Sequence, residues 1–185
     1  MAKEPIAGRV KTRLGREIGM VRAAWWFRHR LAHLVRSLSD PRWDTLLAVT
    51  PDTAIASPAF GPMPRLAQGS GDLGTRMARV FRTLPPGPVL IVGADVPGIT
   101  CTHIASAFKA LGRHEAAIGP APDGGYWAIG LKRRKPTTRA LFSNVRWSSP
   151  YAMADTLATM PGLDIARLPM LTDVDTAAEF ARLSR

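Results

Sequence analysis

The feature that most restricts the fold is a short apolar run, PVLIVG, at residues 88–93. Two prolines and a glycine precede the run, and Gly93 ends it. Proline and glycine at both ends of a short apolar run are typical of a buried strand. Strands with such continuous apolar runs are typical of parallel sheets that helices cover on both faces. The run therefore predicts an α/β protein with a parallel central strand.

Further short apolar runs alternate with stretches of helical periodicity. We predict strands at 45–50, 116–119, 126–131 and 165–168, and helices at 17–38, 72–84, 100–111, 150–160 and 176–183. Residues 51–71 are rich in Pro, Gly, Ala and Ser and are expected to form an exposed loop. Strands that alternate with helices indicate a three-layer α/β fold with a mostly parallel sheet.

Length and composition indicate one globular domain over residues 1–185. Apolar residues make up 46% of the chain and charged residues 21%, which is ordinary for a globular protein. No apolar run approaches the roughly 20 residues that cross a bilayer, and no apolar leader segment opens the chain. A single cysteine, Cys101, excludes an intramolecular disulfide and suits a reducing compartment. We therefore expect a cytoplasmic protein without a membrane partner.

The charge distribution points to an anionic ligand. The net charge is +11, and residues 1–36 hold nine Lys or Arg against two Glu. Such a field attracts polyanions, either nucleic acid or the phosphates of a nucleotide, although a solvated basic helix face would look the same. No known nucleic-acid-binding motif is present, and core packing explains the aromatic run at 25–27. A nucleotide is therefore the favoured partner.

Carboxylates follow several of the predicted strands, where ligands of such sheets bind. Asp95 follows the 88–93 run, and Asp123 lies between two strands in PDGG. Either could hold a divalent cation that bridges phosphates, but Asp95 could also cap a helix and Asp123 could form a hairpin turn. Asp173 and Asp175 precede the last predicted helix, where one could reach a metal and the other could cap the helix.

The opening segment has the composition of a phosphate-binding loop. Gly8, Arg9, Lys11 and Arg13 lie just before a predicted helix, where backbone N–H groups and basic side chains can hold phosphate oxygens. The Walker pattern GxxxxGK[ST] is absent, which excludes the P-loop nucleoside triphosphatases.

Six ordered segments together resemble one bacterial family over essentially the whole chain. They are KEPIAGRVKTRL, QGSGDLGTRM, VLIVGADVPGIT, GPAPDGGYWAIGL, RWSS and LTDVDTAAEF. The family consists of glycosyltransferase-like proteins of the radical-SAM/selenodomain-associated or arsenosugar-biosynthesis type, formerly a domain of unknown function. It is similar to the nucleotide-diphospho-sugar transferase superfamily, which implies a Rossmann-like GT-A fold.

The resemblance assigns roles to individual residues. It implies that Mg²⁺ or Mn²⁺ holds the phosphates, with Asp95 and Asp175 as the metal ligands and Asp173 as their neighbour. The residues that match the phosphate-binding loop and a further motif of the same cleft are Gly8, Arg9, Lys11, Arg13 and Arg76. Those that match the acceptor-side loop are Asp123, Gly124, Gly125 and Tyr126, with Asp123 as a base or an orienting group.

The implied activity is metal-dependent transfer from a nucleotide-sugar donor to a small-molecule acceptor. Nucleotidyl transfer from a nucleoside triphosphate to a phosphorylated acceptor, with release of pyrophosphate, is the alternative. The sequence does not separate the two reactions, because both use the same phosphate-binding loop and metal. A basic nucleic-acid-binding module and a catalytically inactive family member are further alternatives. Relatives carry an apolar strand before the position of Met1, so we expect the first central strand to be missing and a seam to open in the sheet.

Overall fold

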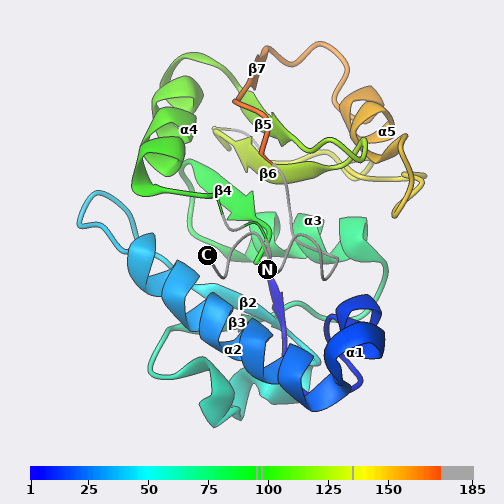
Figure 1. Ribbon diagram of the computed structural model, residues 1–185. Coiled ribbons are helices and arrows are strands. Elements are labelled where there is room, and N and C mark those ends of the chain that lie inside the picture. The colour runs from blue at the N-terminus through cyan, green and yellow to red at the C-terminus, as the bar shows by residue number, and fades with distance from the viewer. Residues whose placement is uncertain (95, 97, 135, 172–185) are drawn as a thin grey trace.

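The computed structural model describes residues 1–94, 96, 98–134 and 136–171 (Figure 1). The helices are α1 (Thr12–Ile18), α2 (Met20–Ser37), α3 (Leu73–Thr83), α4 (Cys101–Arg113) and α5 (Ala152–Ala158). The strands are β1 (Ala2–Lys3), β2 (Leu47–Thr50), β3 (Arg65–Ala67), β4 (Val89–Val92), β5 (Ala116–Pro120), β6 (Tyr126–Leu131) and β7 (Ile165–Arg167). Two 3₁₀ turns, η1 (Asp52–Ala56) and η2 (Pro58–Phe60), join β2 to β3.

The strands form two sheets. The first has the order β1-β2-β3 and both of its pairings are parallel. The second has the order β4-β6-β5-β7, in which β6 is antiparallel to β4 and β5 whereas β7 is parallel to β5. Parallel pairings prevail as predicted, but β4 itself pairs antiparallel, opposite to the expectation for residues 88–93. A continuous apolar run indicates that both faces of a strand are buried. It does not indicate whether the adjacent strand in the sheet runs parallel or antiparallel to it.

Alternate residues of the second sheet face two different helical layers. Ile118 and Ile129 belong to the core cluster around Phe81 of α3. Ala117 and Ala128, their chain neighbours, belong to the cluster that includes α4. Because side chains alternate across a strand, one sheet can bury both faces under helices. This helix–sheet–helix arrangement confirms the three-layer α/β class.

The N-terminal helical region differs from the prediction. The basic opening segment contains α1, which the periodicity did not reveal, and the helix predicted over 17–38 begins only at Met20. Gly19 separates the two helices with φ 95°, a backbone angle that favours glycine. Single glycines of this kind end helices, so the break is a local property of the sequence.

The region predicted to be an exposed loop, 51–71, contains a strand. β3 pairs in parallel with residues 47–49 of β2, and its three residues are half-buried. A strand of three residues, followed by Gln68 and Gly69, is too short to show an alternation of apolar and polar residues. The predicted helix at 176–183 lies outside the described residues.

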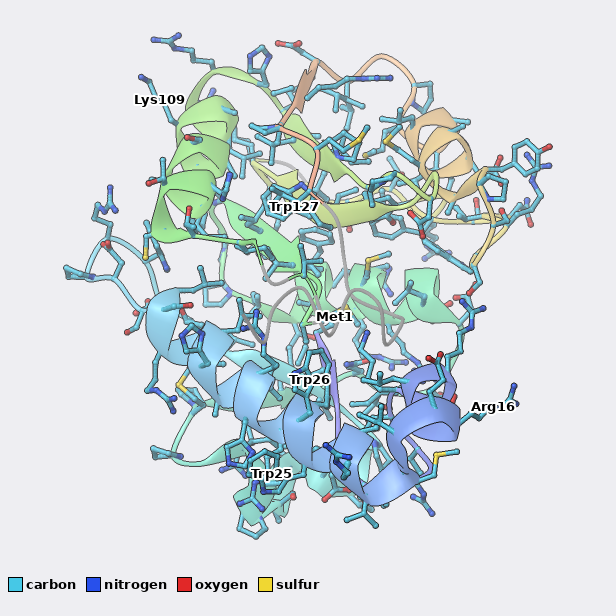
Figure 2. All side chains as sticks on the ribbon, viewed as in Figure 1. Met1, Arg16, Trp25, Trp26, Lys109 and Trp127 are labelled. Atoms are coloured by element: carbon cyan, nitrogen blue, oxygen red, sulfur yellow. The ribbon has the colours of Figure 1, made fainter. Side chains whose placement is uncertain are left out.

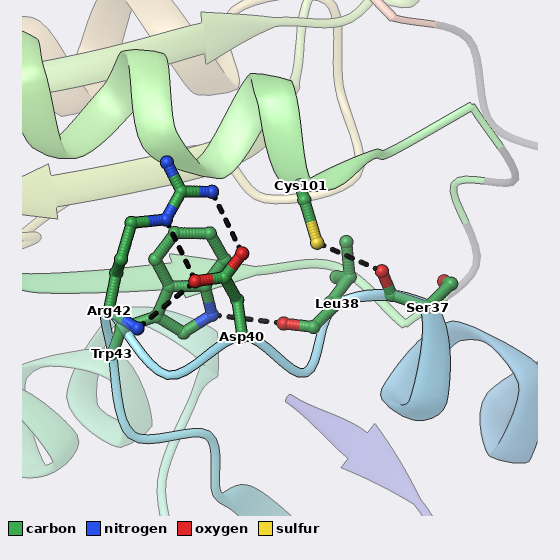
Figure 3. Close-up of polar contacts among 6 residues, drawn as sticks. All are labelled: Ser37, Leu38, Asp40, Arg42, Trp43 and Cys101. Atoms are coloured by element: carbon green, nitrogen blue, oxygen red, sulfur yellow. Dashed lines mark hydrogen bonds and ion pairs between the residues drawn. The ribbon is translucent and has the colours of Figure 1, made fainter.

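Polar contacts fix the end of α2 against α4 (Figure 3). The Cys101 thiol donates to the Ser37 carbonyl at 3.0 Å, and the Trp43 indole N–H donates to the Leu38 carbonyl at 2.9 Å. Arg42 pairs with Asp40 at 2.8 Å, and its hydrogen bonds lower the pKa of that carboxyl to about 2. The Cys101 contact joins the end of α2 to the start of α4, and the other two contacts order the loop at residues 38–43.

The first strand is present, but it is only two residues long. Ala2 pairs with Val49, and the terminal amino group of Met1 donates to the Val92 carbonyl at 2.7 Å, so the chain start bridges the two sheets. Next to this bridge, β2 and β4 border an apolar cavity of about 160 Å³ whose lining includes Ala48 and Leu90. Only two residues of the first strand are thus present, and the expected seam between the two sheets takes the form of this cavity. None of the described helices has the length and apolarity that spanning a bilayer requires.

Candidate functional site

A second, larger cavity of about 450 Å³ lies where the carboxyl ends of β1, β2 and β4 meet α3 and β6. Met1 and Trp127, both labelled in Figure 2, belong to its lining. Cavities that hold small organic ligands have volumes of this order. Its position agrees with the rule that α/β sheets bind ligands beyond the carboxyl ends of their strands.

The charged side chains in the described lining are all basic. They are Lys3, Arg9, Lys11, Arg13 and Arg76. The first four come from the opening segment and the last from α3, so two distant parts of the chain supply the charge. No carboxylate belongs to the lining that the structure describes. A cleft with one sign of charge concentrates counter-ions, so this cavity attracts anions.

The backbone of the opening segment presents Lys11 in an unusual conformation. Lys11 has φ 45° and ψ 45°, in the left-handed region that residues other than glycine seldom adopt, and α1 begins at the next residue. Such backbone outliers concentrate at functional sites, where the surrounding structure maintains them. Gly8, with φ 76°, is absent from the lining; it serves the turn in which the Arg9 N–H donates to the Ile6 carbonyl at 3.0 Å.

The segment 68–76 forms the wall that carries Arg76. Arg79 donates from Nη1 to the Gln68 carbonyl at 2.7 Å and to the Ser70 carbonyl at 3.3 Å. Gly69 has φ 76°, which favours glycine, and a Cβ there would displace the Arg79 guanidinium, because it would lie 1.3 Å from that same nitrogen. Arg76 donates from Nε to the Gly71 carbonyl at 2.8 Å, which holds its guanidinium at the cavity.

Gln68 belongs to the lining and was not identified from the sequence. Its side chain is 3% exposed, and Nε2 donates to the Ala2 carbonyl at 3.2 Å and to the Ala48 carbonyl at 2.8 Å. It therefore ties β1 and β2 together beside the cavity. A polar residue directly after a strand indicates a ligand-binding position in such a sheet, but Gln68 could not be recognised in this way because β3, the strand before it, was not predicted.

Tyr126 lines the cavity as a neutral group. Burial raises the pKa of its hydroxyl above the ordinary value, and the hydroxyl lies 3.3 Å from the Thr156 hydroxyl and 4.0 Å from the Met77 sulfur. Its ring meets the Trp147 ring edge to face at 6.5 Å. The residue shapes the wall and stays protonated near neutral pH.

The rest of the predicted acceptor-side loop forms the hairpin between β5 and β6. Asp123 is exposed, and its Oδ1 accepts the Gly125 N–H at 2.9 Å, as in the turn interpretation. Gly124 has φ 84°, and a Cβ there would lie 2.2 Å from the Pro150 carbonyl oxygen. Asp123, Gly124 and Gly125 are not among the residues that line the cavity, so of this loop only Tyr126 reaches it.

The predicted metal ligands Asp95 and Asp175, with their neighbour Asp173, lie outside the described residues. Within the described ranges, no three His, Cys, Asp or Glu side chains gather into a group that could hold a metal ion. The described lining is basic, so by itself it does not fit a divalent cation. The metal hypothesis therefore depends on Asp95 and Asp175.

Residues 33–149, more than half of the chain, match the family described as uncharacterized proteins conserved in bacteria, DUF2064. The chain belongs to DUF2064. No curated protein matches this DUF2064 chain.

Solved structures agree with the fold. A Desulfovibrio desulfuricans G20 protein, provisionally named a nucleotide-diphospho-sugar transferase, is 30% identical, with a TM-score of 0.86 over 100% of this chain and 84% of its own. Rv0371c of Mycobacterium tuberculosis H37Rv is 12% identical, with a TM-score of 0.56 over 98% of this chain and 92% of its own. A homolog of Rv0371c from Mycobacterium sp. strain JC1 is 13% identical. Its TM-score is 0.53, over 85% of this chain and 80% of its own. The fold is therefore that of the nucleotide-diphospho-sugar transferases.

Proposed function

We propose that this DUF2064 protein is a transferase that uses a nucleotide sugar as its donor. The observation that carries the proposal is the convergence of Lys3, Arg9, Lys11, Arg13 and Arg76 on one cavity at the carboxyl ends of the strands. The diphosphate of such a donor is the part of the molecule that this charge would bind. The similarity to the D. desulfuricans protein, whose provisional name is of the same class, supports it.

In this proposal the basic residues stabilise the leaving group. As the bond from the sugar to the diphosphate breaks, negative charge grows on the nucleoside diphosphate that leaves, and fixed cations lower the energy of that state. In support, Lys11 belongs to the lining and the Nε contact of Arg76 restrains its guanidinium there, so both cations would be near the diphosphate when the donor binds. Positioning and charge are sufficient, so the proposal requires no covalent nucleophile on the protein.

The acceptor side of the proposal involves the hairpin that leads into Tyr126. Asp123 would orient an acceptor hydroxyl or take its proton, using Oδ2, because Oδ1 accepts the Gly125 N–H. The resemblance to transferases of the arsenosugar and radical-SAM-associated type makes a small metabolite in the cytoplasm the acceptor class to test first.

A divalent cation completes the proposal. Asp95 and Asp175 would hold Mg²⁺ or Mn²⁺, which would supply further positive charge to the phosphates. The chain's own contribution through the described residues remains the binding and orientation of the diphosphate.

Ligand screening by thermal shift tests the proposal. Nucleoside mono-, di- and triphosphates and nucleotide sugars are screened with and without Mg²⁺ or Mn²⁺, because a ligand that binds the folded state raises the melting temperature. We expect stabilisation by nucleoside diphosphates and by nucleotide sugars that share one base. Arg76→Gln should reduce the shift, whereas Arg82→Gln, an exposed charge later on α3, should not.

Product analysis separates the two transfer reactions. Release of a nucleoside diphosphate from a nucleotide sugar supports glycosyl transfer, and release of pyrophosphate from a nucleoside triphosphate supports the nucleotidyl alternative. A folded protein that no nucleotide stabilises would overturn the donor-site proposal.

A further inference from the structure

The outward side of α2 is a basic, aromatic strip that the proposed transferase activity does not use. We call it the α2 outer face and define it by its exposed residues Val21, Arg22, Trp25, Arg28, His29 and Arg36. The 18 residues of α2 include no Asp or Glu. Figure 1 shows α2 on the outside of the three-stranded sheet.

The apolar part of the α2 outer face is unusually exposed. Val21 is 73% exposed and Trp25 63%, so the expectation that core packing explains the aromatic run at 25–27 is wrong for Trp25. Large apolar side chains seldom stay in water to this extent together. The His29 ring lies 3.9 Å from the Trp25 ring, and its Nδ1 lies 2.8 Å from the Trp25 carbonyl oxygen. Since a carbonyl only accepts, Nδ1 donates, and this bond restrains the two rings at the surface. The indole is therefore preorganised for contact with something outside the chain.

The arginines of the α2 outer face have no acidic partner within the described ranges. The ion pairs that join Arg to Asp there are Arg42 with Asp40, in the loop after α2, and Arg146 with Asp155, and neither includes an arginine of this face. Arg22, Arg28 and Arg36 thus keep their full charge available for an external anion. The apolar side chains and this charge lie on one convex surface.

The α2 outer face points away from the large cavity. Phe27 lines that cavity, and Trp25 precedes it by two residues, which is about 200° around a helix. A partner on the outer face would therefore leave the cavity accessible.

We propose that the α2 outer face binds the surface of an anionic lipid bilayer. Tryptophan settles at the level of lipid headgroups, arginines pair with the phosphates around it, and a valine gains from the apolar layer beneath. Peripheral binding needs only one helical face, so the lack of a segment that spans the bilayer among the described helices does not oppose it.

The same features fit a nucleic acid less well. Stacking on single strands uses successive aromatic side chains, whereas Trp25 is the one aromatic residue other than histidine in the defined face. Val21 would gain nothing from a phosphate backbone. Convex single helices also offer no groove that follows a strand.

Vesicle co-sedimentation tests the proposal on the full chain. Phosphatidylcholine vesicles are compared with vesicles that contain about 30% phosphatidylglycerol, and we expect binding to the anionic vesicles alone, weakened by salt. Arg22→Gln with Arg36→Gln should weaken the binding roughly 30-fold, since each surface cation contributes about a factor of five. Trp25→Ala should weaken it roughly tenfold, because the apolar anchor is lost.

A matched control removes the same charge elsewhere. Arg82→Gln with Arg113→Gln, at exposed ends of α3 and α4, should leave vesicle binding within about twofold. Equal losses in the two double variants would overturn the proposal, because net charge alone would then explain the binding. So would unchanged binding of Trp25→Ala, no binding to anionic vesicles, or tighter binding to duplex DNA at the same salt concentration.

Discussion

The indole N–H of Trp147 donates a 3.2 Å hydrogen bond to Oδ2 of Asp72, which lies 75 positions earlier in the chain. The other carboxylate oxygen accepts the Thr75 N–H at 2.8 Å and caps α3. Both hydrogen bonds hold the pKa of Asp72 below its ordinary value, and the bond from Thr75 has the larger effect. One carboxylate thus starts the helix that carries Arg76 and anchors the segment around Trp147.

Asp72→Ala should lower the free energy of unfolding by roughly 1 to 2 kcal/mol, since both the helix cap and the Trp147 partner are lost. Urea unfolding followed by circular dichroism measures the change. Asp72→Asn keeps a capping oxygen and should cost less. Equal losses in the two variants would show that capping is not the source of the stability.

Lys11→Ala should weaken nucleotide binding by roughly 1 to 3 kcal/mol, the scale of a lost charge-assisted contact. Isothermal titration calorimetry with the best nucleotide from the screen measures it. Lys109→Ala, on α4 and outside the lining of the cavity, provides the matched loss of charge and should bind normally. An unaltered dissociation constant for Lys11→Ala would remove this residue from the phosphate site.

Asp95→Asn should abolish the part of nucleotide binding that depends on Mg²⁺ or Mn²⁺ and leave the fold intact, because an amide is a poor substitute for a carboxylate at a hard cation. Titrations with and without the metal, beside a circular dichroism spectrum, test this. Metal dependence that survives the substitution would exclude Asp95 as a ligand.

The ion pair of exposed Arg146 with half-buried Asp155 should make the free energy of unfolding depend on pH only under acidic conditions. The hydrogen bonds from Arg146 lower the pKa of Asp155 from 3.8 to about 2 in the folded protein. A lowered pKa means that the stability from the pair is present above about pH 4 and is lost as the pH falls toward 2. Unfolding curves of wild type and Asp155→Asn should therefore converge in that window. Asp44→Asn, an exposed carboxylate outside the described ion pairs, should not change the wild-type profile.

An apolar extension of about five residues fused ahead of Met1 should raise the free energy of unfolding by roughly 2 to 5 kcal/mol. The register of Ala2 with Val49 directs such a segment past Leu47 and into the apolar cavity of about 160 Å³ between β2 and β4. Differential scanning calorimetry measures the gain. An extension of equal length made of Gly and Ser should give none, and equal melting temperatures for the two would show that the cavity does not accept a strand.

Local patterns in the sequence determined the elements whose cause is local. The strand at 88–93 and the helix that begins after Asp72 follow from neighbours along the chain and appear where they were predicted. The hairpin around Asp123 is the turn alternative that the sequence also offered. The basic charge of the opening segment is likewise a property of the sequence itself. The family and the expectation that Arg76 lines the cleft came from the resemblance and not from any local pattern.

Tertiary structure alone decided what depends on contacts between distant segments. The direction of β4 is set by β6, nearly 40 positions later, and the existence of β3 by its pairing with β2. The convergence of Lys11 and Arg76 on one cavity, and the place of Gln68 beside them, arise only when the carboxyl ends of the strands are brought together. The periodicity of apolar residues indicates which side of a segment is buried. Which other segment covers that side depends on how the whole chain packs.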